Sequence, residues 1–330
     1  MRHMKAFRKR NSQRGFHQSF RSQSAMEYLM TYGWAILIIA VVLAALFELG
    51  VFNPMTFAPK AAPGSCQVVR PDGPGTTDFI SLSGECNGEL PQYSGSISNK
   101  SVEWVQIPSS PTMNTAWDGG SYTITAWFDE QTPLNSSTGR PIVEEATGCT
   151  SGLWVGGSNP SEYSIVSIQW YGSGDTCTNI GKDMAGLGGI PYNKWVFLSD
   201  VFHYVPGGTG NYIAVCMDGG CNNVTWSEPS QPTDYAESGY DFEIGSWPCC
   251  SARLEGGNIA DVQLYNTSLS NNQLKALYQE GIGGAPIKIQ NLIGWWPLNG
   301  NTNDYSGNGN NGVPNGITYT SSWYSGYSTP

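Results

Sequence analysis

The chain has 330 residues, enough for one large or two ordinary domains, and a formal net charge of −10. Residues 1–21 contain seven of the 16 Lys and Arg and no acid, so the other residues have 9 basic and 26 acidic side chains and a net charge of −17. This acidic balance argues against nucleic acid as a partner, because the phosphate backbone attracts basic surfaces.

One long apolar segment follows the basic one. Within the 19 residues Leu29–Phe47 the polar residues are Thr31 and Tyr32, and the last 13 residues are apolar without interruption. As a helix this stretch would be about 28 Å long, close to the ~30 Å hydrocarbon core of a bilayer. Its second half lacks the polar stripe of a helix that packs on a globular core. We therefore expect residues 23–50 to form a hydrophobic membrane helix.

The residues in front of the apolar segment indicate what kind of signal it is. No small-residue cleavage triplet follows the segment, as it would in an ordinary secretory signal, and the polar residues Arg21-Ser22-Gln23-Ser24-Ala25-Met26-Glu27 precede it. This arrangement resembles the class III signal peptide of archaeal type IV pilin-like proteins. The resemblance implies that a prepilin-type peptidase cuts between Ser22 and Gln23, although the family usually has Gly where this chain has Ser22. It also implies that Glu27, then the fifth mature residue, meets the amino terminus of a like subunit in a filament.

Two other interpretations of this segment stay open. Ser24 and Glu27 have the spacing of a helix capping box, in which the two side chains satisfy backbone N–H groups at the start of a helix. Alternatively, residues 1–22 are never removed, and the protein is a membrane-anchored, lectin-like binding protein that does not polymerise.

The distribution of charge and cysteine predicts the topology. The positive-inside rule places residues 1–22 in the cytoplasm and residues 48–330 at the cell surface. All eight cysteines lie on the outer side, where disulfides form; they are Cys66, Cys86, Cys149, Cys177, Cys216, Cys221, Cys249 and Cys250. Four N-glycosylation sequons also lie there, at Asn99, Asn135, Asn223 and Asn266.

One disulfide pair is predicted directly. Cys216 and Cys221 flank the four-residue turn Met-Asp-Gly-Gly, which places two facing strand residues within bonding reach across a hairpin. Adjacent Cys249 and Cys250 can bond to each other only with strain, so separate partners are expected. The connectivity of the six cysteines outside the hairpin stays open.

Beyond the membrane segment, residues 51–65 contain Pro54, Pro59 and Pro63 and predict a stiff linker. From Cys66 onward, short β-branched and aromatic runs alternate with turn residues, which indicates a large all-β sandwich. The expected strands cover residues 102–107, 122–128, 164–170, 195–201, 212–217, 240–244 and 259–265. One helix is expected after Ser270, because Ser270 and Gln273 form a capping box and Gly281 stands where a helix commonly ends.

These segments carry a second resemblance, to LamG-like (concanavalin A-like) jelly rolls. The most specific is GGNIADVQLYNTSLSNNQLKALYQEG, in which a strand ending in Tyr precedes a Leu-Ser turn and a capped helix. The other matching segments are Gly120–Phe128, Lys194–His203, Tyr212–Gly220 and Phe242–Ser246. The resemblance implies that residues 66–330 form an extracellular jelly roll that binds carbohydrate or protein.

The order of the matching segments is unusual. In the family, a segment like GWWPLNGNTNDYSGNGNNG opens the domain, but here it lies at Gly294–Gly312. We therefore expect a circularly permuted domain in which residues 294–330 match the usual first segment. That segment either completes its own sandwich, which is the default, or is donated to a neighbouring molecule.

Several side chains are candidates for chemistry. Asp304, Asn301, Asn303, Asn308 and Asn310 offer the oxygen ligands that a structural Ca²⁺ prefers, although Asn-rich and Gly-rich runs also suit turns without metal.

Catalysis has little support in the sequence. Asp241 and Glu243 should share a strand face about 7 Å apart, within the range of glycoside hydrolases, but the Glu-x-Asp-x-x-Glu string of jelly-roll glucanases is missing. His203 is the one histidine outside the leader, since His3 and His17 lie within it, which argues against a His-based triad. The remaining candidates are aromatic rings that could stack on sugars at loop tips, namely Trp117, Trp247, Trp323 and Tyr324.

We therefore expect a non-enzymatic surface subunit that combines assembly through its helix with adhesion through its jelly roll.

Overall fold

The computed structural model describes residues 19–48, 66–98, 103–118, 120–132, 140–145, 151–156, 164–171, 178–179, 182–183, 189–205, 209–226, 241–247, 252–254 and 256–330. The chain divides into two compact units, residues 1–60 and 61–330, and each is described by itself. The predicted linker, residues 51–65, lies outside the described residues.

In the first unit the structure describes one helix, α1 (Ser19–Glu48), as the apolar run predicts. Its segment Met26–Leu46 has a mean hydropathy of 2.4 and is long and apolar enough to cross a membrane, by length and composition alone. The helix begins at Ser19, upstream of the position that a capping box would require. Ser24 therefore lies inside the helix, and the prediction that it caps the helix is wrong for the uncut chain.

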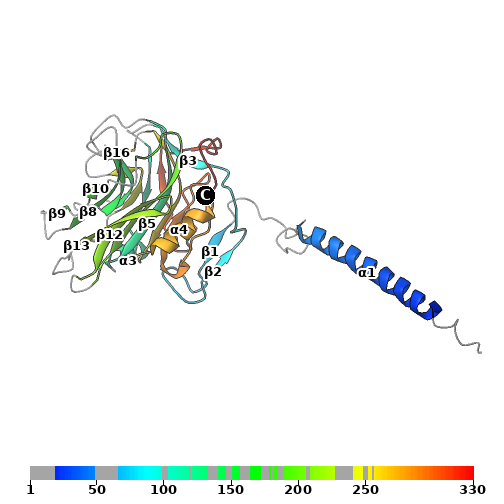
Figure 1. Cartoon of the computed structure of the whole chain (residues 1–330). Coiled ribbons are helices and arrows are strands. Elements are labelled where there is room, and N and C mark those ends of the chain that lie inside the picture. The colour runs from blue at the N-terminus through cyan, green and yellow to red at the C-terminus, as the bar shows by residue number, and fades with distance from the viewer. Residues whose placement is uncertain are drawn as a thin grey trace, which may run out of the picture. The chain divides into compact units, whose positions relative to one another are not determined.

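The second unit is a sandwich of two antiparallel sheets (Figure 1). The first sheet has the order β13 (Gly220–Trp226), β12 (Asn211–Met217), β11 (Trp195–His203), β5 (Tyr122–Glu130), β17 (Gly257–Tyr265), β3 (Ser94–Ile97) and β20 (Thr318–Thr320), with β18 (Leu292–Trp296) also paired to β17. The second sheet has the order β10 (Lys182–Asp183), β8 (Ser164–Tyr171), β7 (Ser151–Gly156), β6 (Arg140–Glu145), β14 (Phe242–Ile244), β4 (Trp104–Ile107) and β19 (Val313–Asn315), with β9 (Thr178–Asn179) paired to β8.

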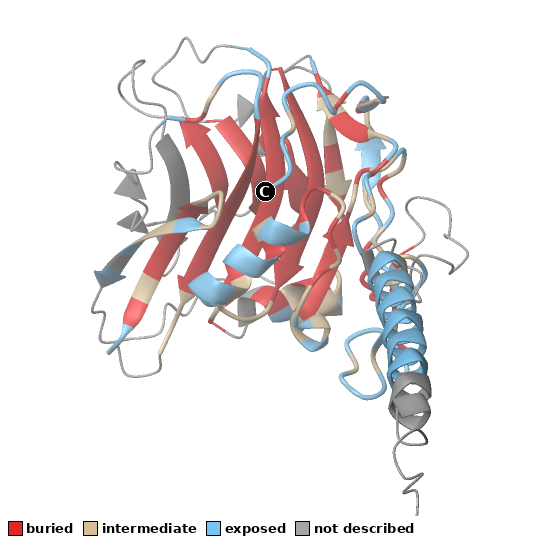
Figure 2. Cartoon of the chain, turned by 45° about the vertical axis from the view of Figure 1, so that its right-hand side comes forward, coloured by how far each residue is buried: buried red, intermediate tan, exposed pale blue. Residues whose placement is uncertain are grey.

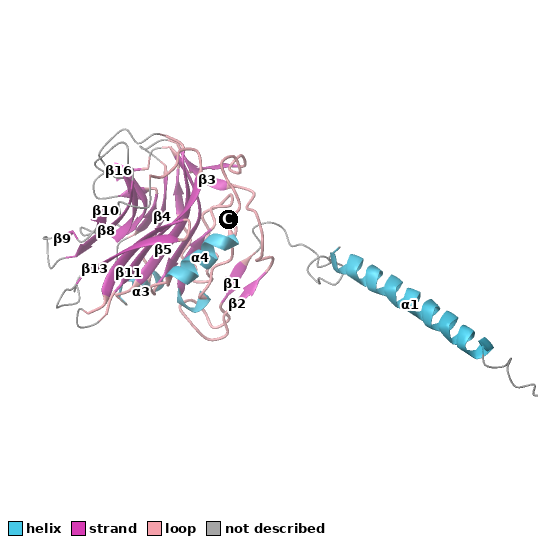
Figure 3. Cartoon of the chain, in the orientation of Figure 1, coloured by secondary structure: helices cyan, strands magenta, loops and turns pink. Residues whose placement is uncertain are grey.

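Smaller elements complete the unit, as Figure 3 shows. They are the strand pairs β1 (Gln67–Val69) with β2 (Ser81–Ser83) and β15 (Ser246–Trp247) with β16 (Ala252–Arg253), the helices α3 (Pro111–Asp118) and α4 (Asn271–Glu280), and the 3-10 turn Ile289–Asn291.

Two hydrophobic cores result from alternation along the strands of the first sheet. On β5, Ile124 and Phe128 face the second sheet and join its Val105 and Leu153 in the core between the sheets. Trp127 points the opposite way, into a second core beneath α4. The middle of the first sheet is therefore covered on both faces, and Figure 2 shows its central strands as buried and the outer side of α4 as exposed.

The long predicted elements are confirmed. All seven expected strands are present, as β4, β5, β8, β11, β12, β14 and β17. Helix α4 begins at the predicted capping box: the Ser270 hydroxyl accepts a hydrogen bond from the Gln273 backbone N–H, and the Gln273 side chain accepts one from the Ser270 N–H. It ends at Gly281, which has a positive φ of 82°.

The C-terminal segment pairs within its own chain. Strands β18, β19 and β20 hydrogen-bond to β17, β4 and β3, respectively, so the segment contributes to both sheets. This is the default arrangement predicted for residues 294–330.

Helix α3 was not predicted. At its start the Ser110 hydroxyl accepts a hydrogen bond from the Met113 N–H, and Pro111 occupies the first helical position, where a missing N–H costs nothing.

The disulfide between Cys216 and Cys221 is confirmed: the two residues face each other across the hairpin of β12 and β13. A second disulfide joins Cys66 to Cys86 and closes the segment that carries β1 and β2. The other four predicted disulfide residues, Cys149, Cys177, Cys249 and Cys250, lie outside the described residues.

Candidate functional site

A polar pocket of about 460 Å³ lies at the end of the first sheet where β5 ends and β17 begins. This volume is within the range of small-molecule sites, which is about 300–1,000 Å³. Its described lining consists mainly of hydroxyl, amide and glycine residues, together with one carboxylate, Asp129, and one large aromatic ring, Trp323.

A row of polar side chains across four strands forms part of this end of the sheet. Asp129 on β5 pairs with Asn258 on β17, Asn258 pairs with Ser96 on β3, and Ser96 pairs with Thr318 on β20. Residues that pair directly across antiparallel strands present their side chains on the same face. The sheet therefore brings together side chains that are more than 200 positions apart in the sequence, and the first three of them line the pocket.

Backbone hydrogen bonds fix the loop beside this row. The Gly256 carbonyl accepts from the N–H groups of both Gln131 and Thr132, at 2.9 and 3.1 Å. Gly256 has a φ of 68°, and a Cβ at this position would lie 1.8 Å from the Thr132 hydroxyl oxygen. Glycine is thus required for the close approach of the two chain segments. Across the rim, the Asn193 N–H donates to the Glu130 carbonyl at 2.8 Å.

The C-terminal tail forms the remaining wall. Trp323 is 3% exposed; its indole N–H donates to the Pro91 carbonyl, and its own carbonyl accepts from the Trp195 indole N–H at 2.6 Å. The prediction of Trp323 as an exposed ring at a loop tip is therefore wrong, because its partners lie far away in the sequence. Tyr324 is exposed, as predicted. The side chains of Trp117 and Trp247 lie outside the described part of the chain.

Asp129 has an unusual environment. Its side chain is 1% exposed, and its Oδ2 accepts hydrogen bonds from Gln131 Nε2 and from Asn258 Nδ2. Its Oδ1 is buried without a donor among the described residues. Burial raises the pKa of this carboxyl, and the two amide donors act against that shift. A buried acceptor without a partner is costly, so Asp129 favours a ligand group that donates a hydrogen bond.

The carboxyl pair that was considered for glycoside hydrolysis lies elsewhere. Asp241 accepts from Gln106 Nε2 at 2.5 Å and from the Ser109 N–H at 3.0 Å, so it connects β14 to the loop that precedes α3. Glu243 is buried on β14, opposite Gln106 and Glu144 of the neighbouring strands. Neither Asp241 nor Glu243 lines the polar pocket. These two carboxyls are therefore not part of the polar pocket.

The residues predicted for Ca²⁺ do not fit a metal site. Asp304 Oδ1 accepts from the N–H groups of Trp295 and Ser306, and its Oδ2 accepts from the Ser306 hydroxyl and the Asn310 N–H. Asn308 Oδ1 accepts from the Gly75 N–H at 2.8 Å, and its amide nitrogen donates to two backbone carbonyls. Protein donors thus already occupy the oxygens that would bind the ion.

Asn301 of that loop is used in the same way. Asn301 Oδ1 accepts from the Asn303 N–H at 2.9 Å, which forms a local turn. Among the described residues, no group of three His, Cys, Asp or Glu side chains could hold a metal ion. The loop is therefore held in place by its own hydrogen bonds.

Two of the four predicted glycosylation sites can be placed. Asn223 is exposed on β13, and Thr225 of its sequon is exposed as well. Asn266 is half-buried and accepts from Asn291 Nδ2 at 3.0 Å, and the Ser268 hydroxyl of its sequon is hydrogen-bonded to His203 Nδ1. Asn99 and Asn135 lie outside the described residues.

No family model and no curated protein matches this chain. Among solved structures, it is similar to a protein from Bacteroides ovatus described as a candidate carbohydrate-binding protein, with 17% identity over 73% of this chain and 63% of that one and a TM-score of 0.48. It is also similar to the enzymatically active domain of tailspike protein 2 of bacteriophage CBA120, with 12% identity over 66% of this chain and 34% of that one and a TM-score of 0.41. A third is the CBM40 of the Ruminococcus gnavus IT-sialidase, with 9% identity over 56% of this chain and 97% of that one and a TM-score of 0.39.

This chain thus spans less than two thirds of the first two proteins. All three TM-scores are below 0.5, and these similarities assign neither a family nor a ligand to it.

Proposed function

We propose that this protein is a cell-surface carbohydrate-binding protein whose ligand occupies the polar pocket. The observation that carries the proposal is Asp129, a buried carboxylate in the pocket wall with one oxygen that lacks a donor. Sugar hydroxyls donate and accept hydrogen bonds, and the surrounding amide and hydroxyl side chains can do both in return. The indole of Trp323 adds an apolar surface at the edge of the pocket.

Removing the charge of Asp129 is therefore expected to weaken glycan binding. Asp129→Asn keeps the shape of the side chain but replaces a charged acceptor, and hydrogen bonds to charged groups contribute about 1.5–3 kcal/mol, which corresponds to roughly a 10- to 100-fold loss of affinity. A glycan array would identify ligands of the full-length protein in detergent, and isothermal titration calorimetry would give the affinities.

Asp78→Asn is the matched control, because it makes the same change at an exposed residue outside the pocket. It should bind like the unmodified protein. Equal affinities for all three proteins would place the binding site elsewhere, and an array without any ligand would contradict carbohydrate binding itself.

The finer parts of the proposal concern the rest of the chain. We infer a LamG-like, circularly permuted jelly roll outside the cell, supported by the antiparallel sandwich and by disulfides that suit an oxidising compartment. Helix α1 would be the membrane anchor. The class III signal peptide, cleavage by a prepilin-type peptidase and assembly with like subunits through Glu27 belong to the same proposal, as does the uncleaved anchor as its alternative.

Amino-terminal sequencing of the protein purified from its native membrane separates these two fates. A mature chain that begins at Gln23 is expected on the pilin-like path. A chain that still begins at Met1 would favour the uncleaved, lectin-like anchor and would leave no role for Glu27 at a new amino terminus.

A further inference from the structure

We propose that the pocket selects neutral sugars and rejects anionic ones such as uronic acids and sialic acids. This inference rests on the proposed carbohydrate binding and specifies its ligand class. It follows from the charges around the pocket rather than from its size.

The described lining contains one ionisable side chain, the carboxyl of Asp129, and no Lys, Arg or His. Among the described lining residues, an anionic sugar would therefore find no cation to pair with. Proteins that bind carboxylate or phosphate ligands usually supply Arg or Lys for this purpose. The fixed negative charge at Asp129 would also repel a second carboxylate in a partly buried site.

A second carboxylate reinforces this charge from behind the rim. Ser98 lines the pocket, and its N–H and hydroxyl both donate to the carboxylate of Glu103, which is 9% exposed. The lysine nearest in sequence, Lys194, follows the rim residue Asn193 but interacts electrostatically with Asp218. The described carboxylates at the pocket are thus negative charges that no described lining residue neutralises, in keeping with the acidic charge of the outer part of the chain.

The hydrogen-bonding groups favour an uncharged ligand that is rich in hydroxyls. Asp129 offers an acceptor without a donor, while Asn258 and the exposed Gln131 and Asn193 present amides that both donate and accept. A hydroxyl has both functions, whereas a carboxylate accepts only. A carboxylate group placed against Asp129 would consequently leave it without a donor in addition to being repelled.

Matched oligosaccharides test this selectivity. We expect a galactan tetrasaccharide to bind the full-length protein in detergent at least roughly 10-fold more tightly than the corresponding galacturonan tetrasaccharide, measured by calorimetry, because like charges at short range repel strongly where water is partly excluded. If the array identifies another neutral glycan as the ligand, that glycan is compared with the matching oligosaccharide of uronic acids. Asp129→Asn should reduce this preference, since it removes the repelling charge.

A second variant keeps the test valid if Asp129→Asn fails to fold. Ser322→Lys adds a cation at an exposed rim residue and alters no buried side chain, so it should raise affinity for the uronate probe several-fold. Ser83→Lys adds the same charge at an exposed residue outside the pocket and should not.

Each outcome separates this inference from the proposed function. Equal or tighter binding of the uronate by the unmodified protein would overturn the neutral selectivity and leave carbohydrate binding intact. Tighter binding of a chitosan tetrasaccharide than of its neutral chitin counterpart would overturn it in favour of a cationic ligand. If no probe binds, the proposed function itself fails.

Discussion

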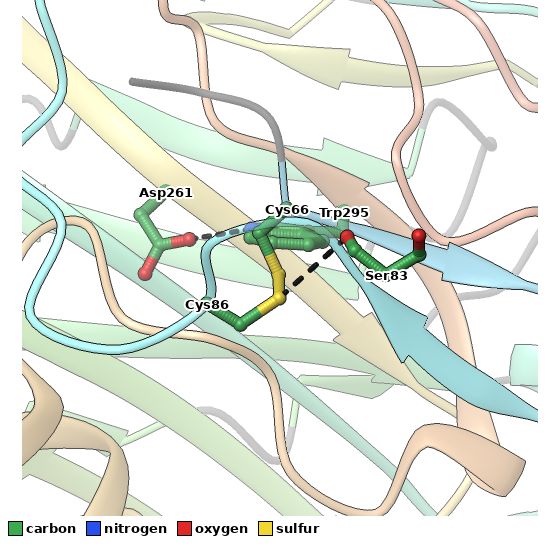
Figure 4. Close-up of a disulfide and its surroundings, with 5 residues drawn as sticks. All are labelled: Cys66, Ser83, Cys86, Asp261 and Trp295. Atoms are coloured by element: carbon green, nitrogen blue, oxygen red, sulfur yellow. Dashed lines mark hydrogen bonds between the residues drawn. A yellow bond between two sulfur atoms is a disulfide. The ribbon is translucent and has the colours of Figure 1, made fainter. Parts of the chain in front are cut away.

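Raising the pH from 4 to 8 is expected to destabilise this domain through one buried carboxyl, and Asp261→Asn is expected to remove that dependence. Asp261 is 3% exposed on β17, and burial raises its pKa from 3.8 to about 7, against the hydrogen bonds from Gln263 and Trp295. Trp295 Nε1 donates to Asp261 Oδ1 at 2.7 Å, and Figure 4 shows this contact beside the Cys66–Cys86 disulfide. Asp261, Trp295 and Cys66 line the same small cavity.

The sign of the effect follows from which state binds the proton more tightly. The folded pKa is above the unfolded one, so protonation of Asp261 favours the folded state. Its contribution is complete below about pH 3.8 and is lost as the pH rises toward about 7, after which it stays constant. A pKa difference of this size corresponds to a loss of about 4 kcal/mol in the free energy of unfolding.

Asparagine is the appropriate replacement at this position. Asp261 has a φ of 50° at an irregularity in the pairing of β17 with β5, and Asn tolerates this left-handed conformation as Asp does. The amide cannot ionise, so the difference in unfolding free energy between variant and unmodified protein should shift in favour of the variant by up to about 4 kcal/mol between pH 4 and pH 8.

Urea unfolding followed by tryptophan fluorescence at several pH values would measure this difference for the full-length chain in detergent. Subtracting the unfolding free energy of the unmodified protein from that of the variant cancels the contributions of the carboxyls that both proteins contain. Asp78→Asn, an exposed change of the same kind, should show a difference that is small and nearly constant. A difference for Asp261→Asn that is equally constant would mean that this carboxyl is ionised throughout the range.

How much of the structure could be predicted depended on how local the determining contacts are. β5, β11 and β17 each have nine residues with clear strand composition, and α4 has its own cap, so these elements could be read from neighbouring residues. β19 and β20 have three residues each, too few to show alternation.

The candidate site is the part that sequence reasoning missed. Asp129, Asn258 and Ser96 come together only through the register of three strands, and register is set by long-range packing. The one local signal was an acidic pair at the end of the apolar run AWFDE, in which Asp129 is two residues after the buried Trp127 and so lies on the same face of the strand. Asp241 and Glu243 were easier to notice, because they are close in the sequence, but neither of them lines the polar pocket.

Replacing Arg70 by Met is expected to destabilise the domain by about 3–5 kcal/mol, the cost of removing the charged partner from a buried hydrogen-bond network. Arg70 is 8% exposed and donates to four backbone carbonyls: those of Thr76 and Ser306, and those of Ile289 and Leu292 near the start of β18. It thereby connects the segment that directly follows β1 to the C-terminal segment that includes β18.

The expected magnitude depends on the four backbone carbonyls that lose their donor when methionine replaces Arg70. Its side chain replaces the aliphatic stem of Arg70, but four carbonyls lose a charged donor, and those that stay buried without a partner carry a desolvation cost of about 1–3 kcal/mol each, which does not add up fully. Electrostatic attraction to the buried Asp304 is lost as well. Arg70→Lys should cost about half as much, because one ammonium group cannot reach all four carbonyls.

Urea unfolding at neutral pH would measure both variants against Lys275→Met, which removes a positive charge from the exposed side of α4 and should change stability by less than about 0.5 kcal/mol. Non-reducing mass analysis would verify that the Cys66–Cys86 bridge near Arg70 still forms. A cost below about 1 kcal/mol for Arg70→Met would mean that water replaces the guanidinium at these carbonyls, and that packing of β1 and β18, rather than Arg70, holds the two ends of the domain together.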